Sequence, residues 1–238
     1  MPQKLQGRIA LVTGASRGIG RAAAIALGAE GAHVICVART VGGLEETDDA
    51  IQKAGGTATL VPLNLKDFAA IDRLGASIFE RWKKLDALLG NAGTLGVLTP
   101  LTHLEPKVFQ ELVELNVTAN WRLIRSLDPL LKMSDSGRAL FVSSAAARRH
   151  TPFWGGYAMS KAALESLAFT YAEECLGTNV RVNLLNPGPV RTMMRAKAMP
   201  GEDPSTLPRP EELAPLIVEL LSSTTEKHGE LVNFKRNP

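Results

Sequence analysis

The feature that most constrains the fold is an alternation of short apolar runs with longer stretches of helical period along the 238 residues. The runs are rich in Val, Ile and Leu, as buried strands are, and the stretches between them repeat apolar residues every three or four positions. A parallel sheet requires this order, because each connection between parallel strands crosses a face of the sheet as a helix. We therefore predict a doubly wound α/β fold with a seven-stranded parallel sheet and helices on both faces.

The strands are expected near residues 8–13, 33–38, 57–63, 85–90, 138–143, 180–186 and 230–234. The helices are expected near residues 18–30, 43–54, 68–83, 105–131, 157–176 and 210–221. Such boundaries carry an error of about two to four residues. No repeat or low-complexity tract divides the chain, and doubly wound folds reach this length around one core, so residues 1–238 are expected to form a single domain.

Composition argues against several functional classes. The net charge of +3 is small and the basic residues are dispersed, so no nucleic-acid partner is expected. Cys36 and Cys175 lie far apart, and the four histidines show no ligand spacing, so no metal site is predicted. The first residues lack the apolar stretch of a signal peptide and no run reaches membrane-spanning length. We expect a cytoplasmic protein with no membrane partner.

The segment from Met193 to Pro210 breaks the alternation. It contains four prolines and three methionines and is interpreted as a long loop that closes over the substrate. Together with Leu95, Phe153 and Trp154, its first residues suggest an apolar pocket, although core packing or oligomer contacts explain them equally well.

A glycine-rich turn, Thr13-Gly-Ala-Ser-Arg-Gly-Ile-Gly20, directly follows the first expected strand and opens the first helix. Glycines at these positions permit a tight turn and a close approach of the backbone to a pyrophosphate, which the free amides of a helix N-terminus attract. The pattern is typical of a Rossmann-type dinucleotide site, although a plain strand-to-helix turn is the alternative. The residues expected to bind the cofactor are Gly14, Ser16, Arg17, Gly18, Ile19 and Gly20.

The second strand is followed by Arg39, without the Asp or Glu that binds the adenosine ribose in an NAD site. Arg39 and Arg17 offer two guanidinium groups, whose shape matches the oxygens of a ribose 2′-phosphate. We therefore predict NADP(H) as the cofactor. The alternative is that both arginines are only solvated.

Tyr157 and Lys161 lie four residues apart at the start of an expected helix, so they share one helical face. A cation near a phenol favours the phenolate, so Lys161 is expected to lower the pKa of Tyr157 and to make it a general acid and base. Ser144, at the carboxyl end of the fifth strand, is the candidate that binds the substrate oxygen. Ser143 is interpreted as a strand terminator, and a surface pair is the alternative for Tyr157 and Lys161.

Over nearly its whole length the sequence resembles the short-chain dehydrogenase/reductase family in its single-domain form. The motifs occur in the family's order and approximate spacing: the turn from Thr13 to Gly20, Gly90-Asn91-Ala92-Gly93, Asn116, Ser144, Tyr157 with Lys161, and Pro187-Gly188 with Thr192. The resemblance implies an oxidoreductase that moves a hydride between nicotinamide and a carbonyl or alcohol.

The resemblance also implies a catalytic tetrad. Asn116 would maintain a water relay to Lys161, which also binds the nicotinamide ribose, while Ser144 and Tyr157 hold the substrate oxygen. A helix-interior Asn satisfied by backbone is the alternative for Asn116. Further cofactor contacts are implied at Asn64, Leu65, Asn91, Ala92, Gly93, Pro187, Gly188, Val190 and Thr192.

Three departures from the family pattern stand out. Asn64 replaces the usual Asp near the adenine, Gly90 replaces the first of two asparagines, and residues 229–238 lack the usual terminal Gly-Gly. The segment Arg191-Thr-Met-Met-Arg195 resembles a bacterial subgroup whose substrates are undefined. Adenine contacts and subunit contacts are therefore expected to differ from the usual pattern.

Two other functions compete with an NADP-dependent carbonyl reductase. A redox sensor that binds NADP(H) without turnover has no use for a positioned proton donor, and a hydrolase built on Ser144 and Lys161 lacks a nucleophile elbow. We expect a small-molecule carbonyl or alcohol substrate. The long helices at residues 105–131 and 157–176 resemble those through which the family pairs subunits, so a homodimer or homotetramer is expected.

Overall fold

The computed structural model describes residues 3–236, and all seven of its strands belong to one parallel sheet in the order β3-β2-β1-β4-β5-β6-β7. The strands are β1 (Ile9–Thr13), β2 (His33–Ala38), β3 (Thr57–Pro62), β4 (Ala87–Gly90), β5 (Arg138–Val142), β6 (Arg181–Asn186) and β7 (Leu231–Asn233). Each lies within three residues of its predicted bounds, because the apolar runs are short and clearly delimited. The predicted doubly wound fold is confirmed.

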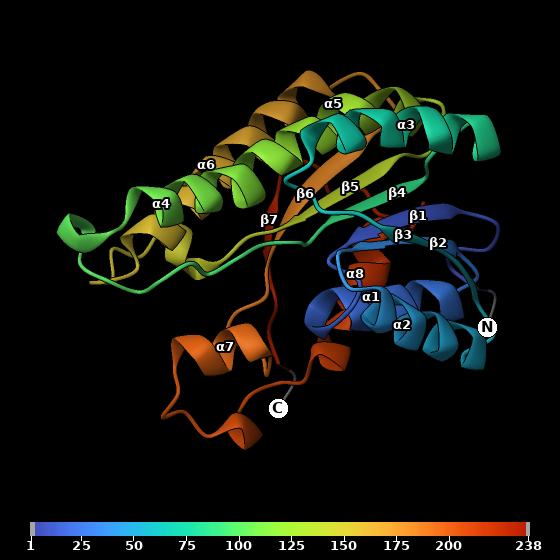
Figure 1. Ribbon diagram of the computed structural model, residues 1–238. Helices are drawn as coiled ribbons and strands as arrows, with labels where there is room; N and C mark the ends of the chain where they lie inside the picture. The colour runs from blue at the N-terminus through green and yellow to red at the C-terminus, as the bar shows by residue number, and fades with distance from the viewer. Residues whose placement is uncertain (1–2, 237–238) are drawn as a thin grey trace.

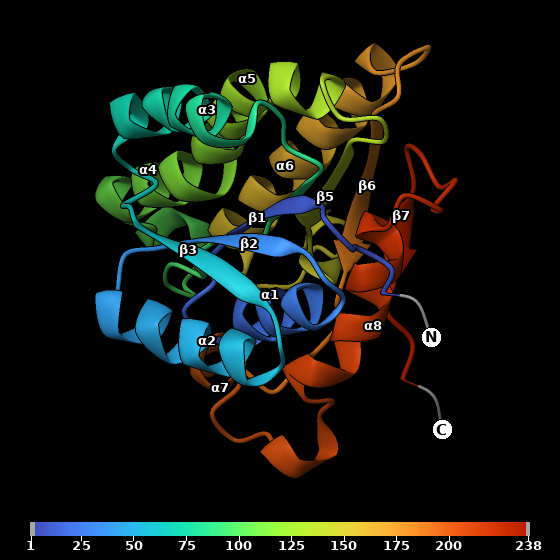
Figure 2. The same ribbon diagram turned by 90° about the vertical axis from the view of Figure 1, so that its right-hand side faces the viewer.

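Helices cover both faces of this sheet (Figures 1 and 2). One face carries α3 (Phe68–Trp82), α4 (Pro106–Val113), α5 (Ala119–Lys132) and α6 (Gly155–Glu174), and the other carries α1 (Gly18–Ala29), α2 (Val41–Lys53) and α8 (Pro210–Leu221). No helix within residues 3–236 combines the length and the apolar character that crossing a membrane requires.

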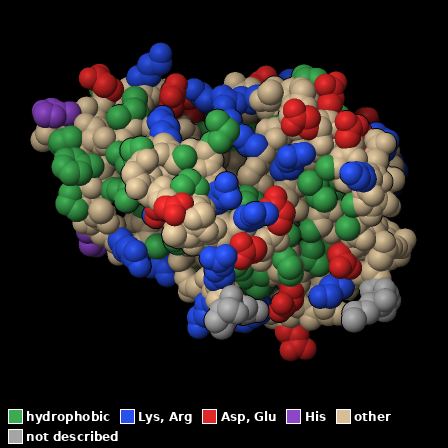
Figure 3. Space-filling view, turned by 90° about the horizontal axis from the view of Figure 1, so that it is seen from below, with side chains coloured by type: hydrophobic (Ala, Val, Ile, Leu, Met, Phe, Trp, Pro, Cys, Tyr) green, Lys and Arg blue, Asp and Glu red, His purple; other side chains and the backbone are tan. Residues whose placement is uncertain are grey.

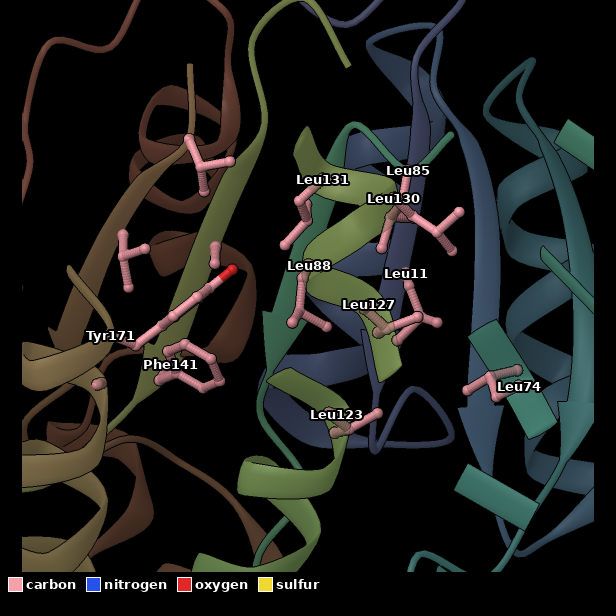
Figure 4. Close-up of a cluster of buried hydrophobic side chains, with 14 of the residues drawn as sticks. Leu11, Leu74, Leu85, Leu88, Leu123, Leu127, Leu130, Leu131, Phe141 and Tyr171 are labelled. Atoms are coloured by element: carbon pink, nitrogen blue, oxygen red, sulfur yellow. The ribbon is translucent and has the colours of Figure 1, made fainter. Parts of the chain in front are cut away.

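Each face of the sheet has its own apolar core. In the close-up of one of them, Leu11, Leu88 and Phe141 project from neighbouring strands toward Leu127 of α5 and Tyr171 of α6 (Figure 4). The first four of these side chains are completely buried, and each buried Leu or Phe stabilises a fold by about 1.5 to 3 kcal/mol. These cores hold the strand ends, and therefore the loops beyond them, in fixed positions.

The order of the strands creates a switch point between β1 and β4. The chain builds outward from β1 through β2 to β3, then crosses back to place β4 on the other side of β1. Open α/β sheets bind ligands in the crevice outside the carboxyl ends of the strands at such a point. The turns after β1 and β4 therefore face one crevice.

The prediction of one continuous α-helix at residues 105–131 is wrong, because the structure has two α-helices there, α4 and α5. Residues Glu114–Thr118 form a π-helical segment between α4 and α5. The side chain of Asn120 donates to the main-chain oxygen of Asn116 at 2.9 Å and so satisfies a carbonyl within the widened turn. Segments of this kind interrupt helices frequently at functional sites.

The segment at residues 193–210 is also more ordered than the predicted loop. Its first six residues form the short helix α7 (Met193–Ala198), because the Thr192 hydroxyl accepts a hydrogen bond from the amide of Arg195 at 3.2 Å and caps the first turn. A 3₁₀ turn (Pro204–Thr206) follows, and the prolines keep the remainder irregular. After β7, the Phe234 amide donates a hydrogen bond to the Asn186 carbonyl oxygen at 3.0 Å. Residues 237 and 238 lie outside the described chain.

Candidate active site

A cleft of about 830 Å³ runs along the carboxyl edge of the sheet. It is lined by the turns that follow each of the strands β1 to β6, and by α7. Lys and Arg side chains are numerous on the face of the molecule that carries α7 (Figure 3). Of the predicted site residues, the cleft is lined by Gly14, Ser16, Arg17, Gly18, Ile19, Arg39, Leu65, Asn91, Ala92, Gly93, Ser144, Tyr157, Lys161, Pro187, Gly188, Val190 and Thr192.

Three predicted site residues do not line the cleft. Gly20 is buried in α1 behind the glycine turn, and Asn116 is buried in the π-helical segment. Asn64 is exposed, and its side chain accepts a hydrogen bond from the Lys66 amide at 3.1 Å, which stabilises a local turn. Gly20 and Asn116 therefore shape the site from behind, whereas the structure gives Asn64 no place in the cleft wall.

The glycine turn fits its predicted purpose. Gly14 and Gly18 have φ angles of +69° and +57°, in the region that favours glycine. A Cβ atom on Gly20 would collide with the carbonyl oxygen of Gly14, so the third glycine permits close packing of helix on turn. The amides at the start of α1 are thereby left facing the cleft.

Asn91 joins the two sides of the switch point. Its Nδ2 donates to the carbonyl oxygen of Thr13 at 2.9 Å, and its own amide donates to the Thr13 hydroxyl at 2.9 Å. The Thr13 hydroxyl in turn donates to Leu89 at 3.2 Å. Although predicted as a cofactor contact, the Asn91 side chain acts in this structure as a clamp between the ends of β1 and β4.

The two predicted phosphate-binding arginines are available to a ligand. Arg17 precedes α1 and Arg39 follows β2, and both side chains are exposed at the edge of the cleft. Within the described chain, neither guanidinium forms an ion pair with a carboxylate. Among the described residues, the one side-chain hydrogen bond of Arg17 goes to the sulfur of Met193, which lies 3.9 Å from Nη1. Their charge is therefore not neutralised by an acidic residue.

Tyr157 is almost buried, at 8% exposure, in the first turns of α6, and its ring lies edge-on to that of Trp154 at 6.1 Å. Burial raises the pKa of Tyr157 to about 12, while the Ser144 hydroxyl acts in the opposite direction. The expected lowering of this pKa by Lys161 is therefore wrong, because desolvation of the phenolate dominates. Near neutral pH the phenol is a protonated hydrogen-bond donor.

Lys161 is buried directly behind the tyrosine. Its Nζ lies 5.9 Å from the centroid of the Tyr157 ring and donates to the carbonyl oxygen of Val142 at 2.8 Å. Burial lowers the pKa of Lys161 to about 8, and the carboxylate of Glu165 opposes this shift. The site thus holds an ammonium that can lose its proton close to neutral pH.

Asn116 fixes the turn that follows β4. Its side chain accepts from the Thr94 amide at 2.8 Å and donates to the Thr94 carbonyl at 2.9 Å, and it also donates to the Ser160 hydroxyl at 2.9 Å. A Cβ atom placed on Gly93 would lie 3.1 Å from Asn116 Oδ1 and 3.6 Å from Lys161 Nζ, so both side chains reach the same glycine. Asn116 therefore ties the β4 turn to α6 beside Lys161.

A buried carboxylate behind the site, Glu165, was not predicted. Ser143, interpreted as a strand terminator, donates to Glu165 Oε1 at 2.5 Å, and Arg148 donates to the same oxygen at 3.1 Å. The spacing of Glu165 from Lys161, again four residues, places both on one face of α6 and is the signal that points to this carboxylate.

The short helix α7 lines part of the cleft with Arg195 and Lys197, which sequence analysis did not assign to the site, and with methionines that it placed in an apolar pocket. Arg195 forms a bidentate pair with Glu202, with both distances 2.6 Å, and Lys197 donates to the Gly96 carbonyl at 3.4 Å across the cleft. Met193 and Met194 are exposed at its edge. Their position depends on the helical turn, which the prolines around it obscure in the sequence.

Comparison with known proteins is consistent with this geometry. A family model for short chain dehydrogenases matches residues 8–203. The uncharacterized oxidoreductase YciK of Escherichia coli is 37% identical over 226 residues, which are 94% of this chain and 89% of YciK.

Solved structures resemble the chain over almost its full length. A short chain dehydrogenase from Pseudomonas syringae superposes with a TM-score of 0.94 at 41% identity, covering 98% of this chain and 96% of the other. A short chain dehydrogenase from Shigella flexneri, solved in complex with NADP, superposes with a TM-score of 0.93 at 37% identity, covering 98% and 99%.

Proposed function

The chain belongs to the short-chain dehydrogenase family, and from that premise we propose that it is an NADP(H)-dependent oxidoreductase acting on a carbonyl or alcohol. The observation that carries the proposal is one cleft that contains Ser144, Tyr157 and Lys161 beside a glycine turn. The NADP bound in the Shigella relative supports the choice of cofactor.

The residues present fit NADP(H). Arg17 and Arg39 would hold the 2′-phosphate, the amides after Gly14 would face the pyrophosphate, and Lys161 would reach the nicotinamide ribose beside Gly93. The turn from Pro187 to Thr192 would contact the nicotinamide. When bound, NADPH supplies the hydride.

In the proposed mechanism, the substrate oxygen lies between Ser144 and Tyr157. The Ser144 hydroxyl donates a hydrogen bond to it and orients the carbonyl. As negative charge develops on this oxygen, Tyr157 transfers its phenolic proton, and in the reverse direction it accepts the proton. The high pKa of the buried phenol keeps that proton in place until the substrate requires it.

Lys161 and Asn116 support this transfer. The Lys161 ammonium, held by the Val142 carbonyl, stabilises the phenolate that forms on Tyr157. Asn116 holds the turn at Thr94 in position, and the lone pairs that remain on its oxygens can accept hydrogen bonds from a water bound to Lys161.

The experiment that tests the proposal is a panel of carbonyl compounds, covering quinones, α-diketones, ketoacids, sugars and steroids, followed by NADPH absorbance. Consumption with at least one compound, absent without it, is the expected result. Tight NADPH binding with no turnover on any compound would instead favour the redox sensor.

We also propose that the protein acts as a homodimer or homotetramer. Exposed apolar side chains are present on these long helices: Trp121 of α5 and Leu176, just beyond α6, are 43% and 60% exposed. Light scattering at micromolar concentration should give a mass at least twice that of the 25.5 kDa chain.

A further inference from the structure

The end of β5 and one face of α6 are connected at three successive levels. Residues 142–144 supply the contacts from the strand, and Tyr157, Lys161 and Glu165 supply them from the helix, at intervals of four residues. Ser144 lies beside Tyr157, the Val142 carbonyl accepts from Lys161 at 2.8 Å, and Ser143 donates to Glu165 at 2.5 Å. The proposed mechanism uses the first two levels and leaves the third without a role.

Glu165 is a buried carboxylate, exposed by 7%, and such groups are costly unless paired and hydrogen-bonded. Its Oε1 accepts from both Ser143 and Arg148. A structural contact between β5 and α6 would not require a charge here, because Ser143 could be held equally by a neutral acceptor. The Ser143 hydrogen bond alone therefore does not account for the charge, part of which is paired with Arg148.

Lys161 lies one helical turn before Glu165 on α6. Burial lowers the pKa of Lys161 to about 8, and Glu165 is the charged side chain that opposes this shift. On the same face of α6 lies the phenol of Tyr157, protonated near neutral pH. The loop after β5 contributes Arg148, which pairs with Glu165, whereas Gly93, whose built Cβ would lie 3.6 Å from Lys161 Nζ, brings no charge.

We propose that Glu165 is a positioning residue: through Ser143 it fixes the strand end that carries Ser144, and its charge, one turn from Lys161 on the same face of α6, stabilises the Lys161 ammonium. Arg148 moderates this effect, because its guanidinium neutralises part of the carboxylate charge. The catalytic importance of the effect rests on the proposed function, whereas the electrostatic coupling of Glu165 to Lys161 can be measured without a substrate.

The test is an NMR titration of ¹³C-lysine-labelled protein, in which the Cε signal of Lys161 is assigned by its absence in Lys161→Met. Glu165→Gln keeps the oxygen that accepts from Ser143 and removes the charge. The titration midpoint of Lys161 should then fall by about one pH unit, as expected on loss of a nearby opposite charge. The matched control is Glu173→Gln, the same substitution at an exposed position of the same helix, which should leave the midpoint unchanged.

A second variant tests the same coupling in case the Glu165→Gln protein does not fold. Arg148 is 52% exposed, so Arg148→Met should fold normally and should shift the midpoint in the opposite direction, upward, by a smaller amount because water screens the guanidinium. A midpoint that is unchanged in both variants, or that moves downward in both, overturns the proposal.

A third variant separates the hydrogen bond from the charge. Ser143→Ala leaves the carboxylate in place and should lower kcat several-fold while the Lys161 midpoint stays within experimental error of the wild type. Once a carbonyl substrate is known, the alkaline limb of kcat/KM in Glu165→Gln should move with the NMR midpoint. If the wild type reduces no carbonyl, the proposed function fails while the midpoints still decide the coupling.

Discussion

The Lys161 ammonium lies over the ring of Tyr157, 5.9 Å from its centroid, and its hydrogen bond goes to the Val142 carbonyl and not to the phenol. This arrangement keeps the two groups in separate roles. The phenol retains its proton as an acid, and the ammonium provides charge behind it.

Replacing Tyr157 with Phe should remove the proton donor and leave the apolar packing of the ring with Trp154. Turnover should fall by roughly 10² to 10⁴. The NADPH dissociation constant, measured by fluorescence titration, should change little because the hydroxyl is not expected to bind the phosphates. Activity equal to the wild type would exclude Tyr157 as the general acid.

Carbonyl reduction should decline as the pH rises through about 8. The pKa of Lys161 is lowered to about 8, so the ammonium loses its proton there, whereas Tyr157, with a pKa of about 12, remains protonated. The measurement is kcat/KM for the carbonyl substrate against pH at saturating NADPH. A rate that stays constant up to the ordinary lysine pKa of 10.5 would contradict the assignment.

Replacing Lys161 with Met should stabilise the protein at neutral pH while abolishing most activity. The folded pKa of about 8 lies below the ordinary 10.5, so the unfolded chain binds the proton more tightly and burial of the ammonium opposes folding by up to about 3 kcal/mol. This penalty is complete below the folded pKa and disappears as the pH rises past the unfolded one. Urea denaturation at pH 7 should show a higher free energy of unfolding for Lys161→Met than for the wild type. The loss of the hydrogen bond to the Val142 carbonyl should make this gain smaller.

The same titration provides the check on that prediction. The stability advantage of Lys161→Met should shrink as the pH rises from about 8 toward 10.5, the interval between the two pKa values. Lys53→Met, at an exposed position of α2, should show no such dependence. A pH-independent advantage would mean that packing, and not charge, causes it.

Replacing Arg39 with Asp should erase or reverse a preference for NADPH. Two guanidinium contacts to a 2′-phosphate should favour NADPH over NADH by roughly one to three orders of magnitude, and a carboxylate at residue 39 would repel that phosphate. The ratio of kcat/KM for the two cofactors measures the effect. Arg73→Asp, the same charge change at an exposed site on α3, is the control and should keep the wild-type ratio.

The segment around α7 should close over bound ligand. Within the described chain, its side-chain hydrogen bonds to the opposite wall are those from Lys197 to Gly96 at 3.4 Å and from Arg17 to Met193 at 3.9 Å, both from exposed side chains. Its apolar anchor is Ala198, which packs against the small cluster that contains Tyr157. NADPH should therefore slow tryptic cleavage after Arg195 and Lys197 several-fold. Identical cleavage with and without NADPH would argue against a lid.

The sequence predicted the sheet well because its central strands are apolar at nearly every position and fully buried. The glycine turn was equally clear, since backbone with positive φ at Gly14 and Gly18 favours glycine at those positions. The features that were missed depend on contacts between distant segments. In the widened helical turn, the Asn116 side chain accepts a hydrogen bond from the Thr94 amide, which belongs to the turn after β4. The helix α7 begins where the Thr192 side chain caps it.

The errors in the chemistry have a common physical origin. The spacing of Tyr157 and Lys161 shows that they are neighbours but gives no measure of how much water each has lost, and desolvation decides both pKa values. Glu165 illustrates the same point, because a carboxylate in the middle of a helix is ordinarily solvated. Its burial becomes visible only when Ser143 and Arg148 are placed against it.

The clamp of Asn91 on Thr13 joins residues 78 positions apart in the chain. The two sides of the crevice therefore come together only when β4 pairs with β1, and β4 follows β2 and β3 in the chain. Such long-range closure is slow compared with helix formation, and a nascent chain that ends before Asn91 cannot assemble the site. Acquisition of cofactor affinity during synthesis would consequently mark the moment at which the two halves of the sheet join.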